Sequence, residues 1–167
     1  MPSPRLAPVS VILAMGAAAP AVADEGPLVR HVVSAAQAEA MVDAAVAEAA
    51  SRRLSVSIVV VDDRGDIVAA HRMDGSNLNY FEIARRKAAT SAHFRTPSKD
   101  IEAAVVGGLN GSGGFMGSML LDNAMPRQGA LPLKLGDATI GAIGVSGAKP
   151  DEDEQIAAAG LRAITKE

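Results

Sequence analysis

The chain lacks cysteine and tryptophan, and it has only four aromatic residues, namely Tyr80, Phe81, Phe94 and Phe115. The absence of cysteine excludes disulfides, thiolate-bound metals, iron–sulfur clusters and cysteine nucleophiles. So few aromatic rings leave few platforms on which nucleic-acid bases could stack. Basic runs are also missing: 16 Lys and Arg stand against 19 Asp and Glu, for a net charge of −3. We therefore expect no nucleic-acid partner.

The chain has no apolar run of the roughly 20 residues that a membrane-spanning helix needs. The first 23 residues have instead the order of a secretory signal peptide. Arg5 supplies positive charge, an uncharged apolar stretch covers 6–19, and Ala21-Val22-Ala23 is a small-residue cleavage pattern before Asp24. The alternative is a helical or disordered tail. We predict a signal peptide over 1–23 and a periplasmic or secreted mature domain over 24–167, with no membrane span after cleavage.

The remainder has the size and the apolar content of one domain, since 49% of all residues are hydrophobic. Ser34 and Gln37 form a capping-box pattern before apolar residues at helical spacing. Residues 55–62 (SVSIVVVD) are rich in β-branched residues, and both faces of the second half of this segment are apolar, as in a central strand. We predict helices over 35–52, 80–94, 97–106 and from 151 onward, and strands over 55–62, 67–73, 131–135 and 138–146.

Each pair of strands is separated by a short turn, which makes the pairs antiparallel hairpins. Pro132 places the strand over 131–135 at an edge, because proline cannot donate to a strand ladder. The fold class is therefore an α/β arrangement of one antiparallel sheet of four to five strands flanked by helices. We also expect a homo-oligomer, because the alanine-rich helix permits close contacts and an edge strand needs cover.

Standard catalytic and nucleotide-binding motifs are missing. The glycine-rich stretch over 107–117 lacks the Lys-Ser/Thr pair of a phosphate loop and does not follow a strand. It is more simply a loop at a subunit contact or a pocket mouth. Acidic residues 151–154 (DEDE) are expected to begin the last helix, where the helix dipole favours negative charge. An iron-binding carboxylate cluster is the alternative for this segment.

Few side chains remain that could bind a ligand. His71 is predicted on a strand face with Ile67, Ala69 and Met73, and either His71 or Met73 could ligate a haem iron. His31 precedes the first helix and is the second candidate, while His93 on an outer helix face is the third. The alternative for each is a structural histidine. A zinc site is not expected, because no spacing predicts three converging ligands.

Lys87 shares a semi-apolar helical stripe with Ile83, Thr90 and Phe94. Such a lysine usually extends its ammonium to solvent. Otherwise it lies at a pocket edge, where it could pair with a ligand carboxylate.

The chain resembles the GlcG/HbpS-like haem-binding family, whose domains are also found appended to some corrinoid adenosyltransferases. The resemblance covers nearly all of residues 34–165. It is carried by the segments SVSIVVVD at 55–62, RMDG at 72–75, KAATSAHF at 87–94 with Pro97, GAIGVSG at 141–147 and DEQIA at 153–157 with Gly160. It implies a profilin-like fold, frequent homo-oligomers, and haem or related tetrapyrrole binding in several members. The Glu-x-x-Glu iron motif of some members is absent.

These observations leave three hypotheses. The first is an exported protein that binds haem for sequestration, transfer or sensing. Its binding residues would be His71, Met73, Lys87, Phe94 and His31, with His71 as the iron ligand. The second is an enzyme that acts on a small organic acid, with Lys87 holding the anion. The third is an assembly protein that binds no ligand.

Overall fold

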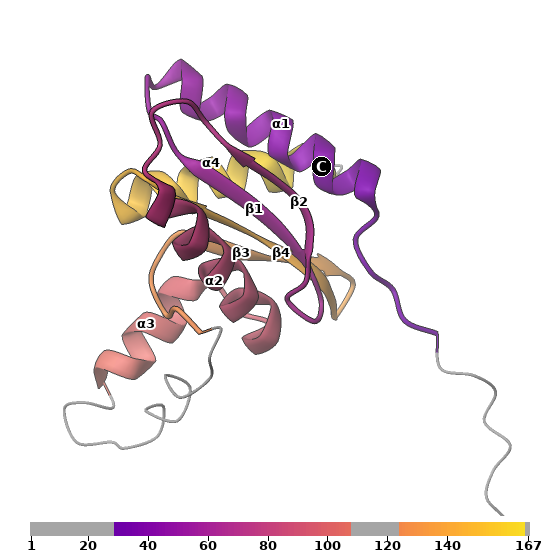
Figure 1. Ribbon diagram of the computed structural model, residues 1–167. Helices are drawn as coiled ribbons and strands as arrows, with labels where there is room; N and C mark the ends of the chain where they lie inside the picture. Colours follow the sequence, from indigo (N-terminus) through magenta and orange to yellow (C-terminus); the bar gives the residue numbers. More distant parts are fainter. Residues whose placement is uncertain (1–28, 108–123, 166–167) are drawn as a thin grey trace, which may run out of the picture.

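The computed structural model describes residues 29–107 and 124–165. Its elements, in chain order, are α1 (Ala35–Ser51), β1 (Ser57–Asp62), β2 (Ile67–Arg72), α2 (Leu78–Phe94), α3 (Ser98–Gly107), β3 (Ala130–Leu135), β4 (Ala138–Ser146) and α4 (Pro150–Arg162). Four strands form one antiparallel sheet in the order β2-β1-β4-β3. Helices α1 and α4 cover one face and α2 covers the other (Figure 1). The predicted fold class and elements are confirmed.

Local sequence signals account for where α1 and α2 begin. The Ser34 hydroxyl accepts a hydrogen bond from the Gln37 backbone at 3.2 Å, and the Gln37 side chain accepts one from the Ser34 backbone at 3.0 Å. This is the predicted capping box at the start of α1. Helix α2 begins after Asn77, whose side chain accepts from the Asn79 backbone.

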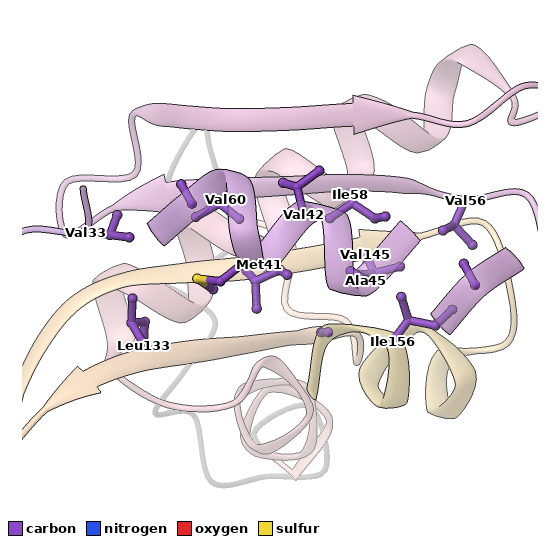
Figure 2. Packing of buried hydrophobic residues seen from close by; sticks show 14 of the residues in the cluster. Val33, Met41, Val42, Ala45, Val56, Ile58, Val60, Leu133, Val145 and Ile156 are labelled. Atoms are coloured by element: carbon purple, nitrogen blue, oxygen red, sulfur yellow. The ribbon is translucent and has the colours of Figure 1, made fainter. Parts of the chain in front are cut away.

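The core lies on both sides of β1, as the apolar character of both its faces predicted. Ile58 and Val60 point toward α1 and α4, while Val59 and Val61 point toward α2. Figure 2 shows the larger cluster, in which Met41 on α1 lies over the strands. Burial of this apolar surface is the main force that stabilises the fold.

Two structural features bear on the predicted oligomer. Strand β3 is an edge strand, as Pro132 predicted. The alanines that we expected to allow contact with a second chain are partly used within this one, because Ala38, Ala45 and Ala49 of α1 are buried in its own core. Helix α1 therefore supports the predicted oligomer less than its alanine content suggests. None of the helices in the described ranges is both long and apolar enough to cross a bilayer.

Candidate functional site

Lys87 lies near the middle of α2, and its side chain is only 3% exposed. Its ammonium donates to the Asp153 carboxylate at 2.8 Å and to the Val145 carbonyl oxygen of β4 at 3.0 Å. The expectation that this lysine extends to solvent is wrong, because the ammonium pairs with a buried carboxylate inside the protein. The ion pair joins α2, β4 and α4 at one end of the sheet.

Asp153 is equally buried, with 3% of its side chain exposed. Its second oxygen accepts from the Ala148 backbone at 3.0 Å, so the carboxylate also fixes the loop between β4 and α4. Burial raises the pKa of Asp153 above its ordinary value, and this effect outweighs the opposing attraction of Lys87. The carboxylate therefore depends on its partner to remain charged in the folded protein.

Glycine at position 129 makes room for the pair. A Cβ atom there would lie 2.7 Å from the Lys87 ammonium nitrogen and 2.9 Å from the Val145 carbonyl oxygen. Gly129 also has a φ of +126°, which side-chain-bearing residues rarely adopt. The chain therefore needs glycine at this position both for space and for backbone conformation.

A cavity of about 210 Å³ opens beside the ion pair. Lys87 and Asp153 lie in its wall, and Arg127 supplies a second cation. The remaining lining residues are mostly apolar or backbone surfaces from α2, β4, α4 and the chain before β3. They are Tyr80, Ile83, Met125, Ser146, Gly147, Ala148 and Pro150. The arrangement can hold a small molecule that has both polar oxygens and a short apolar part.

The structure does not bring the five predicted binding residues together. His71 lies opposite Ile58 in the β1–β2 ladder, so it is on the sheet face that α1 and α4 cover. Met73 packs half-buried against the same cluster. Lys87 and Phe94 belong to α2, which covers the opposite face. Two of these four residues therefore lie on one face of the sheet and two belong to the helix on the other face.

The histidines are all exposed. His71 shares its strand face with Ala69 and Met73, as predicted, but its side chain is exposed, because β2 is an edge strand and its last three residues, 70–72, are exposed. His31 lies in the segment before α1. His93 lies on the outer face of α2 as predicted, and its Nε2 is 2.6 Å from the Arg64 carbonyl oxygen.

Sequence reasoning missed the role of Asp153, which was predicted only as an acid at a helix start. It has that position, but it also belongs to the buried stripe of α4 with Ile156, Ala157 and Gly160. This i, i+3, i+4, i+7 spacing was a signal that could have found it. The alternative of an iron-binding cluster finds no support, since no three potential ligand residues converge within the described ranges.

Comparison with known proteins agrees with this architecture. The model of the family described as haem degrading protein HbpS-like matches residues 33–162. GlcG from Escherichia coli K12 is 35% identical over 115 residues, which cover 69% of this chain and 81% of GlcG.

Among solved structures, a double mutant of HbpS from Streptomyces reticuli is 28% identical, with a TM-score of 0.74 over 90% of this chain and 99% of that one. PduOC, solved in complex with haem, is 26% identical, with a TM-score of 0.71 over 80% of this chain and 95% of that one. The family match covers most of the chain, and the fold agrees along its length. This chain belongs to the HbpS-like family, the same GlcG/HbpS-like family that the sequence motifs indicated.

Proposed function

We propose that this protein is an exported haem-binding protein that sequesters, transfers or senses haem. The observation that carries the proposal is membership of the HbpS-like family over residues 33–162, in which the structural neighbour PduOC was solved with haem. Haem would supply an iron centre and a large flat apolar ring. The chain must then supply an axial ligand, apolar contacts and a cation for the propionates.

The cavity beside Lys87 does not meet these requirements. Its volume of 210 Å³ lies below the roughly 300 Å³ at which small-molecule pockets usually begin, and a porphyrin is a large ligand. None of the three histidines lines it, and Asp153 already neutralises Lys87. A haem would therefore attach outside this cavity.

His31 has surroundings that suit a haem face. It is exposed between Val29 and Val32, which are themselves 82% and 41% exposed. Apolar side chains beside an accessible imidazole can pack against a porphyrin ring while the imidazole binds its iron. We therefore place His31 before His71 as the proposed axial ligand, which reverses the order that the strand pattern predicted.

The segment that carries His31 is held against the sheet. The Val33 backbone donates to the Ile140 carbonyl at 2.9 Å. Arg30 approaches Asp62 at 3.9 Å and Asp63 at 3.7 Å near the β1–β2 turn. Arg30 is a partly exposed cation, and it could turn from these loose contacts to a haem propionate.

A hemin titration followed in the Soret region tests the proposal. We expect a saturable shift with the wild type that is lost or strongly weakened in His31→Ala. His93→Ala is the matched control, because that imidazole already contacts the Arg64 carbonyl. Loss in His71→Ala alone would keep haem binding and move the ligand to β2. The haem proposal fails if the wild type gives no saturable shift.

Haem degradation is a second candidate function, because the description of the matched family names it. Adding ascorbate to the hemin-loaded protein distinguishes haem binding from haem degradation. A binding protein keeps its Soret band at the rate of a matched haem–albumin control, whereas a degrading protein loses it faster and releases iron.

Export rests on the cleavage pattern Ala21-Val22-Ala23 after the uncharged stretch. Protein recovered from its native host should begin at Asp24. A mature product that still begins near Met1 would refute the proposed export.

Self-association is also part of the proposal. The exposed edges of β2 and β3 are surfaces that a second chain could cover. Light scattering at micromolar concentration should give a mass that is a multiple of one mature chain. A mass equal to one chain would contradict the proposal.

A further inference from the structure

The Lys87–Asp153 pair leaves one buried N–H donor without a partner in the part of the chain that the structure describes. An ammonium group has three N–H donors. Within the described residues, Lys87 uses two of them, on the Asp153 carboxylate and the Val145 carbonyl oxygen. The third belongs to a side chain that is 97% removed from solvent and lies in the cavity wall. A buried donor of this kind is costly to leave unpaired, so it is a point of attachment for an oxygen atom in the cavity.

The second cation of the cavity is different in kind. Arg127 is exposed, and its contact with Glu102 is long at 3.5 Å. A guanidinium recognises carboxylates through parallel hydrogen bonds. The lining charges are Lys87 and Arg127 against Asp153, so the cavity carries a net positive charge that favours a singly charged anion. The cavity wall also includes Ile83 and Met125, which suit a short carbon chain.

We propose that this cavity binds a short 2-hydroxy or 2-oxo carboxylic acid. Its carboxylate would pair with Arg127, and its 2-oxygen would accept from the free N–H of Lys87. A 2-hydroxyl could in addition donate to Asp153, whose carboxylate has acceptor capacity left beyond its two observed bonds. The small volume selects acids of few carbons. This site is separate from the proposed haem ligand His31, which does not line the cavity.

Protein-observed NMR titration with matched probes tests the assignment. Lactate carries both groups, propionate lacks the 2-hydroxyl, and propane-1,2-diol lacks the carboxylate. We expect lactate to shift the backbone amide signals of Lys87, Gly147 and Ala148 in a saturable way. It should bind roughly tenfold or more tightly than propionate, because hydrogen bonds to charged groups are the strong ones. Equal affinity for lactate and propionate would overturn the role of the ion pair.

A surface substitution completes the test without endangering the fold. Arg127→Gln should weaken lactate binding at least roughly tenfold, because it removes a charge-assisted pair, and should leave binding of the diol unchanged. Arg162→Gln, an exposed arginine at the end of α4 that does not line the cavity, is the matched control. The proposal fails if lactate binds nowhere, binds at signals remote from the cavity, or is insensitive to Arg127→Gln. None of these measurements involves haem, so this proposal and the haem proposal stand or fall separately.

Discussion

Replacing Lys87 by methionine should reveal how strongly the buried ion pair is coupled. The substitution keeps much of the apolar stem but removes the ammonium that Asp153 and Val145 contact. Asp153 would remain 3% exposed, with only the Ala148 backbone as a donor. Removing one partner of a buried pair costs about 3–5 kcal/mol, because the other charge is left uncompensated. That is a large fraction of the roughly 5–15 kcal/mol by which domains are stable.

The double variant Lys87→Met/Asp153→Asn should recover most of this loss. Both charges are then absent, and the amide oxygen of the new side chain can still accept from Ala148. Replacing both members of a buried pair is often nearly neutral, so we expect the double variant within about 1 kcal/mol of the wild type. A double-mutant cycle with Asp153→Asn as the second single variant measures the coupling.

The effect of Lys87→Met should depend on pH. The pKa of Asp153 is raised in the folded protein by burial, above its ordinary value of 3.8. The contribution of the protonated Asp153 to stability is therefore fully present below pH 3.8. It is lost as the pH rises through the pKa of Asp153 in the folded protein. Losing Lys87 raises that pKa further, so the variant should be less destabilised near about pH 5 than near pH 7.

Urea unfolding followed by circular dichroism at the two pH values measures these differences. The matched control is Lys99→Met, because Lys99 contacts Glu154 at 2.7 Å but has a half-exposed side chain. An exposed pair of this kind contributes little. The reasoning is refuted if Lys87→Met costs no more than Lys99→Met, or if the double variant loses the sum of the two single losses.

Three further predictions follow from the packing and the surface charges. Gly144→Ala should destabilise the protein by about 1–3 kcal/mol in urea unfolding, because the new Cβ would overlap the Ala84 carbonyl oxygen where α2 crosses β4. Met41→Ala should cost about 2–5 kcal/mol, since it empties a fully buried position, and a loss below about 1 kcal/mol would contradict that burial. Hydrogen bonds from Arg85 and from the arginine that follows it lower the pKa of Glu82 to about 2. The stabilisation by this carboxylate is fully present above pH 4.5 and declines as the pH falls toward 2. Glu82→Gln should therefore flatten that part of an acid-unfolding curve. An unchanged curve would argue against the pairing.

Much of the fold could be predicted because local patterns record which face of an element is buried. The capping residues Ser34 and Gln37 marked the start of α1, and the continuous apolar run over 58–61 marked β1 as a strand covered on both faces. Short turns between paired strands implied an antiparallel sheet, and Pro132 marked its edge. The family motifs follow the same elements, so the sequence also sufficed to assign the family.

The site could not be predicted in the same way, because it depends on which residues distant in the chain become neighbours. Lys87 and Asp153 are 66 positions apart, and each has an ordinary local explanation, as a surface lysine and as a helix-starting acid. Only the packing of α2 and α4 at the same end of the sheet makes them partners, with Gly129 leaving room between them. The same packing places His71 on the opposite face from Lys87. Periodicity specifies the buried side of each element, whereas the tertiary structure determines what that side meets.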